Sequence, residues 1–148
     1  MKDAWLLLKQ FHVETEVAVA SAHRTPELLK AYLSRWDSEK VDVIIAGAGM
    51  SAHLPGVVAA YTLTPVIGVP LSSQIFDGED ALYSIVIMPA GIPVATVGVD
   101  NVKNAALLSL QILAIQSPEI KARLVQYRKD LAAAVNKANE ELQEELRS

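Results

Sequence analysis

The sequence contains no cysteine, which excludes disulfides, thiolate metal ligands and cysteine nucleophiles. Only 5% of the 148 residues are aromatic although 51% are hydrophobic. The core must therefore be built from Ala, Val, Leu and Ile, which is typical of helices packed on a parallel sheet. Basic residues are not in excess, because the formal net charge is -4, and a nucleic acid is not an expected partner. No apolar run approaches the ~20 residues that span a bilayer. We expect a cytoplasmic protein with no membrane partner.

Helical and extended patterns alternate along the chain. Helices are expected at residues 2–11, 26–36, 57–61, 81–88, 101–115 and 118–146, and strands at 16–21, 41–46, 65–71 and 93–99. Thr25 and Ser117 each precede a proline and are expected to cap their helices, as is Asp80. This alternation predicts a single α/β domain over residues 1–148, with a doubly wound parallel sheet and a long C-terminal helix.

Residues 41–56 (VDVIIAGAGMSAHLPG) are the segment around which the other motifs are arranged. The apolar strand is expected to enter a turn at Gly47 and Gly49, where the absence of a Cβ allows a ligand to approach the backbone closely. The spacing also matches the dinucleotide fingerprint G-x-G-x-x-G/A. That fingerprint requires an acid at the end of the next strand, but Ser72 follows it here, and Pro55 interrupts the expected helix. A dinucleotide-dependent oxidoreductase is therefore a weaker alternative.

Two histidines follow two expected strands. His23, with Arg24 beside it, comes after the strand at 16–21, and His53 comes after the glycine turn. Because parallel strands end at one edge of a sheet, both imidazoles could face one crevice, where histidine exchanges protons near neutral pH. The alternative is that both are turn residues that hydrogen-bond the backbone and that Arg24 is a solvated charge. His12 is expected to be an exposed residue at a helix end. No two histidines have short ligand spacing, so no metal site is expected.

Five motifs in order resemble one known family. They are SAHRTP (Ser21 to Pro26), AGAGMSAHLPG (Ala46 to Gly56), GVP (Gly68 to Pro70), SIVIMPAGIPVATV (Ser84 to Val97) and NAALLSLQILA (Asn104 to Ala114). Together they resemble the bacterial type of PurE, the N5-carboxyaminoimidazole ribonucleotide mutases of purine biosynthesis. A second class of this family carboxylates aminoimidazole ribonucleotide directly, but it has a different sequence at the glycine turn, so AHLPG favours the mutase.

The resemblance implies a flavodoxin-like three-layer sandwich and an isomerisation that uses no cofactor or metal. The N5-carboxylate of the ribonucleotide substrate leaves as CO2, is held in the site and is recaptured at C4. His23 corresponds to the catalytic histidine that takes the C4 proton, and Arg24 to the residue that binds the phosphate. The substrate-binding residues implied are Ser21, Ala22, Arg24, Ala46, Gly47, Ala48, Gly49, His53 and Leu54. The resemblance also implies a homo-oligomer, an octamer whose sites are built from several subunits.

The sequence differs from the family pattern at the N-terminus. Members begin with a strand and a glycine-serine-aspartate loop that holds the phosphate and ribose, whereas Met1 to Trp5 correspond to the interior of the first helix. About twenty residues, the length of a strand plus two helical turns, are thus not in this sequence. Either the sequence starts at an internal methionine or it omits the front of a longer polypeptide. We expect a chain of only these residues to fold poorly and to lack activity. The alternative function is a non-catalytic ribonucleotide-binding or structural homologue without its phosphate loop.

Overall fold

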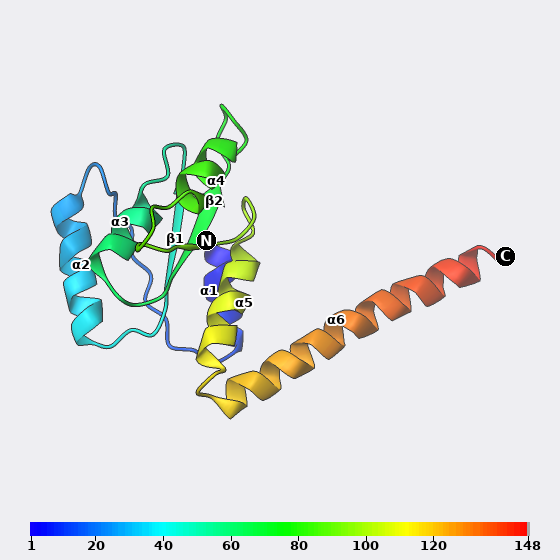
Figure 1. Ribbon diagram of the computed structural model, residues 1–148. Coiled ribbons are helices and arrows are strands. Elements are labelled where there is room, and N and C mark those ends of the chain that lie inside the picture. Colours follow the sequence, from blue (N-terminus) through cyan, green and yellow to red (C-terminus); the bar gives the residue numbers. More distant parts are fainter. Residues whose placement is uncertain (148) are drawn as a thin grey trace.

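A small parallel sheet lies between two layers of helices in the computed structural model, which describes residues 1–147 (Figure 1). Its strands β1 (Ile44–Gly49), β2 (Val66–Leu71) and β3 (Ala95–Thr96) lie side by side in that order. The helices are α1 (Lys2–Gln10), α2 (Pro26–Ser38), α3 (Leu54–Tyr61), α4 (Glu79–Val86), α5 (Val102–Leu113) and α6 (Pro118–Glu145). The predicted α/β class, with its parallel sheet and long C-terminal helix, is confirmed.

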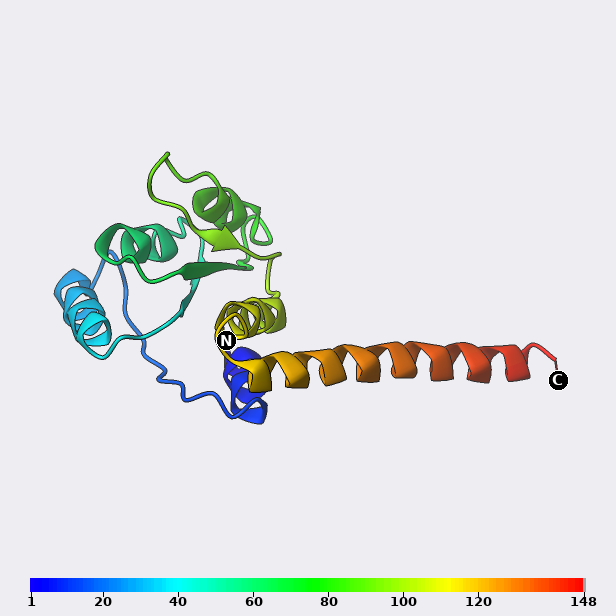
Figure 2. The ribbon, with the colours of Figure 1, turned by 60° about the horizontal axis from the view of Figure 1, so that its bottom comes forward.

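Helices cover both faces of the sheet, as Figure 2 shows. On one face, Leu29 and Leu33 of α2 and Val58 of α3 form a buried cluster with the strands, and α4 packs beside them. On the other face, Ala105 of α5 packs against β2, and α1 lies against the outer side of α5. These layers are the three-layer, flavodoxin-like arrangement that the sequence predicted.

The central strand β2 is buried on both sides. Ile67 and Val69 are fully buried against α5, and Val66 faces the α2 and α3 cluster. A Cβ at Gly68 would lie 2.4 Å from Cγ2 of Ile85, so the glycine at this position lets α4 pack directly on the strand. A strand with helices on both faces must be apolar throughout, which is why β2 reads as a continuous hydrophobic run.

β1 begins and ends three residues later than predicted. It was expected at residues 41–46, with a turn at Gly47 and Gly49, but both glycines lie in the strand. Gly47 pairs with Val69, and Gly49 pairs with Leu71. The turn prediction was wrong because β2 continues to Leu71 and keeps a parallel partner available for β1 up to Gly49.

The predicted strand at residues 16–21 is not formed. Val17 and Val19, which a strand would half bury, are 65% and 89% exposed. Within residues 1–147, β1 pairs only with β2, and no strand lies along its other edge. An extended segment becomes a strand only when a neighbour supplies the hydrogen-bonded ladder, and here that neighbour is not present.

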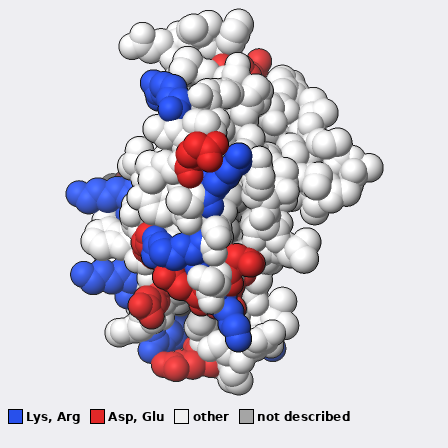
Figure 3. Space-filling model, turned by 90° about the vertical axis from the view of Figure 1, so that its left-hand side faces the viewer, with Lys and Arg blue, Asp and Glu red and all other residues white. Residues whose placement is uncertain are grey.

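This segment is instead held to α2 by one carboxylate. Glu16 accepts hydrogen bonds from the guanidinium of Arg35 and, at 3.1 Å, from Nε1 of Trp36. Arg35 also pairs with Glu39 at 3.2 Å. Seen from the α2 side, acidic and basic side chains are interspersed (Figure 3). Exposed charge pairs and one indole therefore replace the backbone ladder that was expected.

Other boundaries also differ from the prediction, and α3 begins three residues earlier than the expected residue 57. The strand expected at 93–99 is only two residues long, although Val97 and Asp100 still donate backbone hydrogen bonds to β2. Pro93 cannot donate to a ladder, which delays the start of β3. Asp80 does not cap α4, because the helix begins at Glu79, two residues earlier than predicted, after Gly78, whose φ of 92° is in the left-handed region. Asp80 lies in the first turn, where a negative charge still stabilises the helix.

The two C-terminal helices begin at side-chain caps. Asn101 accepts a hydrogen bond from the backbone of Asn104 at the start of α5, and Ser117 accepts one from Ile120 at the start of α6. The cap predicted at Ser117 is thus confirmed. The first turns of α6 pack on α1 and α5, and the rest of the helix projects away from the sheet (Figures 1 and 2). None of the helices described over residues 1–147 is both long and apolar enough to cross a membrane.

We predict that Glu16→Gln lowers the melting temperature by a few degrees at pH 7, because exposed ion pairs contribute little individually. The pKa of Glu16 lies below its ordinary value of 4.5, chiefly because of the hydrogen bond from Arg35. The ionised Glu16 therefore contributes its full share of the free energy of unfolding above pH 4.5. That contribution is lost as the pH falls through the lower pKa that Glu16 has in the folded protein. Thermal unfolding followed by circular dichroism from pH 7 to pH 3 should show the two proteins converging in acid.

The matched control is Glu14→Gln. Glu14 is an exposed glutamate in the same segment. Its substitution should leave the melting temperature unchanged at every pH. Equal effects of the two substitutions at pH 7 would show that the contact with α2 does not hold the segment.

Candidate functional site

His23 and His53 meet at the edge of the sheet where the strands end. Nε2 of His23 lies 2.7 Å from Nδ1 of His53, a hydrogen-bond distance. Their ring centroids are 4.8 Å apart and the rings are inclined at 78°, so the contact is edge to face. Both side chains are exposed. The structure thus brings together two imidazoles that are thirty positions apart in the sequence.

The turn that carries His23 is closed by reciprocal hydrogen bonds. Oγ1 of Thr25 accepts from the backbone N–H of Ser21 at 2.8 Å, and the N–H of Thr25 donates to the Ser21 carbonyl at 3.0 Å. Oγ of Ser21 in turn accepts from the N–H of Arg24 at 3.2 Å. Thr25 still precedes the first residue of α2, but its side chain does not cap the helix. Short polar side chains therefore fix the backbone on both sides of His23.

His53 is placed by the tight turn between β1 and α3. Met50 has a φ of 54°, which reverses the chain directly after Gly49. The N–H of His53 donates to the Ser51 carbonyl at 2.7 Å, and its own carbonyl accepts from the first turn of α3. His53 is thus the residue immediately before α3, with its imidazole outside the helix.

The residues of β1 that were expected to line the site can offer it only main-chain atoms, because the two alanines pack their side chains against helices and the two glycines have none. Ala46 is buried in the α2 and α3 cluster, and Ala48 packs against the cluster formed by Ala52, Ala81 and Ile85. Gly47 faces the other side, where a Cβ would lie 2.7 Å from Sδ of Met1. Gly49 is close to the Leu71 carbonyl. The main-chain groups at the unpaired edge of β1 remain available to a ligand.

The side chains of the remaining predicted residues form no hydrogen bond with either imidazole among residues 1–147. Ala22 and Leu54 are half-buried against the α2 and α3 cluster. Arg24 is exposed, and its guanidinium forms no ion pair with any residue between 1 and 147. A free guanidinium next to the histidine pair can take a phosphate or carboxylate in a bidentate manner.

The histidine pair is not enclosed. Two hollows among residues 1–147 lie elsewhere, one of about 450 Å³ between the end of α1 and α6, and one of about 350 Å³ between α5 and α6. Neither is lined by His23 or His53. Because both imidazoles are exposed, the described residues leave the pair open to solvent.

Sequence reasoning missed the polar residues of the two neighbouring loops. Oδ1 of Asp100, after β3, accepts from the N–H of Ser72, after β2, at 3.0 Å. Hydrogen bonding from Ser72 lowers the pKa of Asp100 below its ordinary value. Oγ of Ser73 and Oδ1 of Asp80 are buried without a hydrogen-bond partner among the described residues. The available signal for Ser72, Ser73 and Asp100 was their position after strands, at the same edge as the histidines, whereas Asp80 lies in the first turn of α4.

The arrangement supports proton chemistry. When both imidazoles are neutral, one ring nitrogen of the contact must donate and the other must accept, so the tautomers of the two rings are coupled. Each ring keeps one further nitrogen outside the contact, which can accept or donate a proton. Among residues 1–147, no group of three or more His, Asp or Glu side chains is placed to hold a metal ion.

Known proteins resemble this chain in both sequence and structure. Residues 1–134 match the family described as AIR carboxylase. The N5-carboxyaminoimidazole ribonucleotide mutase of Pyrococcus abyssi is 57% identical over 131 residues, covering 88% of this chain and 75% of that protein. The enzyme of that name from Methanocaldococcus jannaschii is 51% identical over 138 residues, covering 93% and 85%. The crystal structure of Treponema denticola PurE is similar with a TM-score of 0.85 and 31% identity, covering 95% of this chain and 88% of that one. The resemblance seen in the motifs is confirmed, and the chain belongs to the AIR carboxylase family.

Proposed function

We propose that this chain is an N5-carboxyaminoimidazole ribonucleotide mutase, an isomerase of purine biosynthesis. The relatives that carry this name are about half identical to it over most of its length. The observation that carries the chemistry is the contact between His23 and His53 at the sheet edge, with the unpaired guanidinium of Arg24 beside it in the sequence. The substrate is a small ribonucleotide.

The alternatives are less well supported. No relative reported above is named as a non-catalytic homologue. A dinucleotide-binding turn requires its first two glycines in the turn after the strand, whereas Gly47 and Gly49 are paired within β1. The mutase hypothesis requires only main-chain atoms from these residues. Those atoms are accessible, because one edge of β1 is unpaired among the described residues.

The reaction moves one carboxyl group and one proton within the substrate. The N5–carboxyl bond breaks, N5 takes a proton, and CO2 is released. C4 then forms a bond to CO2 and loses its own proton. In our proposal the imidazole of His23 gives the proton to N5 in the first half and takes the C4 proton in the second, so that no net proton is consumed. Arg24 binds the phosphate, and the backbone of residues 46–49, together with Ser21, Ala22 and Leu54, lines the site.

His53 orients His23 in this scheme. A ring held at 2.7 Å by its neighbour has a defined tautomer and plane, so its free nitrogen is aimed consistently at the substrate. Because the two tautomers are coupled, a proton gained by one ring is accommodated by the other. His53 is therefore a positioning residue whose effect passes through His23.

Released CO2 must be held until C4 recaptures it, and an exposed histidine pair cannot hold it alone. We therefore infer that the working enzyme is a homo-oligomer, an octamer as the family resemblance implies, in which neighbouring subunits cover the site. We also propose a cytoplasmic location, in keeping with the ribonucleotide substrate.

We predict that His23→Asn in the active protein lowers kcat at least about 100-fold, because an amide cannot exchange the proton. Circular dichroism and the oligomeric mass should be unchanged, since His23 is exposed. The matched control is His12→Asn, at the end of α1 and far from the pair in sequence, which should turn over normally. Turnover of His23→Asn equal to that of the parent would refute the proposed role.

We predict that His53→Asn retains more activity than His53→Ala. The side-chain amide of asparagine can occupy the place of Nδ1 and keep the hydrogen bond to His23, whereas alanine removes it. The expected result is a loss in kcat of about tenfold for His53→Ala, with partial recovery in His53→Asn and little change in KM. A merely structural His53 would instead give two variants with equal activity and a lowered melting temperature.

We predict that Arg24→Gln raises KM for the ribonucleotide by about 10- to 100-fold, because a charge-assisted pair to phosphate is lost. The control is the substrate analogue without its phosphate. The parent should prefer the nucleotide strongly in kcat/KM, and Arg24→Gln should lose most of that preference. A preference that survives in Arg24→Gln would show that the phosphate binds elsewhere.

A further inference from the structure

The hydroxyl of Thr25 closes the turn around His23 and does not cap the helix that follows. Thr25 precedes Pro26, the first residue of α2, and a threonine in this place normally accepts a hydrogen bond from an amide of the first helical turn. No such bond forms here. Oγ1 of Thr25 instead accepts from the N–H of Ser21 at 2.8 Å and donates to the Ser21 carbonyl at 3.2 Å. The hydroxyl thus acts as donor and as acceptor toward the same residue.

The backbone inside this turn depends on Ser21 and Thr25. Among residues 1–147, the N–H and carbonyl groups of Ala22 and His23 form no hydrogen bond. The N–H of Thr25 donates to the Ser21 carbonyl at 3.0 Å, and the N–H of Arg24 donates to Oγ of Ser21 at 3.2 Å. Three of the four hydrogen bonds that close the turn therefore come from Thr25.

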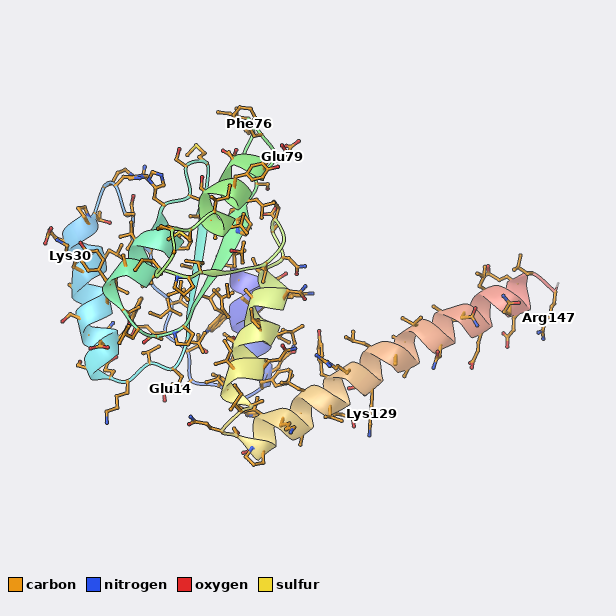
Figure 4. All side chains as sticks on the ribbon, in the orientation of Figure 1. Glu14, Lys30, Phe76, Glu79, Lys129 and Arg147 are labelled. Atoms are coloured by element: carbon orange, nitrogen blue, oxygen red, sulfur yellow. The ribbon has the colours of Figure 1, made fainter. Side chains whose placement is uncertain are left out.

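The chain that leads into the turn has few anchors of its own. Glu16 attaches it near the C-terminal end of α2, and from there it runs past the helix toward the N-terminal half, where Lys30 lies (Figure 4). No hydrogen bond holds the backbone of residues 17–20 among the described residues. The next polar anchor after Glu16 is therefore the set of bonds between Ser21 and Thr25.

Thr25 is itself fixed to the body of the protein. Its carbonyl accepts a hydrogen bond from the N–H of Leu29 at 3.1 Å, and Leu29 is only 4% exposed, in the cluster that α2 forms with the sheet. The turn is thus attached through Thr25 to a buried part of α2.

The place of the His23 imidazole depends on this closure. An imidazole is joined to the backbone by a short side chain, so a shift of the backbone moves Nε2 with it. The contact of Nε2 with Nδ1 of His53 is 2.7 Å long, and a hydrogen bond weakens steeply when its distance or angle changes. His23 therefore has two anchors, its ring contact with His53 and the turn closed by Thr25.

We propose that Thr25 is a positioning residue for proton transfer at His23. Its hydroxyl fixes the backbone on both sides of His23, which keeps the imidazole in contact with His53 and its free nitrogen aimed at the substrate. Thr25 itself contacts no reacting atom. The kinetic part of this inference rests on the proposed function, whereas the geometry of the histidine pair can be measured without turnover.

The kinetic test compares Thr25→Val with Thr25→Ser. Valine has nearly the shape of threonine but no hydroxyl, and serine keeps the hydroxyl. We expect Thr25→Val to lower kcat about tenfold and to change KM less than about threefold, because the long side chain of Arg24 still reaches the phosphate after a small backbone shift whereas the imidazole cannot compensate. Thr25→Ser should recover most of the parent's kcat. Equal kcat for Thr25→Val and the parent would overturn the proposal.

Pro26→Ala is the matched control for stability. It removes the proline at the first position of α2 and should lower the melting temperature by a few degrees, as Thr25→Val should, because proline restricts the unfolded chain. It leaves the hydroxyl of Thr25 in place, so kcat should be unchanged. A loss of kcat in Pro26→Ala as large as that in Thr25→Val would mean that a weakened α2 causes both losses, and the positioning role would be refuted.

The second test observes the histidine pair by NMR in the absence of substrate. The chain contains three histidines, so the signals of isotope-labelled imidazole nitrogens can be assigned, with the exposed His12 as internal reference. At a pH where the imidazoles are neutral, the parent and Thr25→Ser should each show His23 and His53 in one tautomer. In Thr25→Val the signals of both should move toward the tautomer average of His12.

Unchanged imidazole signals in Thr25→Val would overturn the proposal even if kcat fell, because the effect would not pass through His23. Shifted signals with an unchanged kcat would also overturn it, because the position of the ring would then not govern turnover. A parent protein without mutase activity would refute the proposed function, and the NMR comparison would still decide whether Thr25 holds the histidine pair together.

Discussion

The parallel pairing of β1 with β2 is the interaction on which the rest of the structure depends. It buries an apolar strand between two helix layers and aligns the carboxyl ends of the strands at one edge. Because the pairing continues to Gly49, the chain reverses only at Met50, and His53 emerges at that edge. The loop after β2 emerges beside it and is tied to the loop after β3 through Asp100. A shorter ladder would move every one of these groups.

His23 reaches the same edge without the help of a strand. The segment before it is attached through Glu16 to α2, and its own turn is closed by Ser21 and Thr25. The imidazole contact therefore joins a turn of the sheet to a turn at the start of α2. A pair that couples two separately anchored elements is well suited to proton transfer, because its geometry is defined by both anchors, yet the pair remains open to solvent.

That exposure connects the site to assembly. A reaction that releases and recaptures CO2 requires cover, and the chain exposes apolar surface in the groove between α5 and α6 and at Leu131, Val135 and Leu142 of α6. The same physical fact accounts for both surfaces: exposing apolar groups to water costs free energy, and a chain of this size cannot bury all of them.

The sequence by itself determined the fold class, most helices, the cap at Ser117 and the family, because periodicity, capping residues and ordered motifs are local properties of the chain. It also suggested that His23 and His53 could face one crevice, with two structural turn histidines as the alternative. Tertiary structure decided what depends on a neighbour. Residues 16–21 have strand-forming residues but no ladder partner, Gly47 and Gly49 are strand rather than turn because β2 extends alongside them, and Asp80 loses its capping position to Gly78. The 2.7 Å contact between the imidazoles was likewise decided in three dimensions, since no local pattern encodes a distance between residues thirty positions apart.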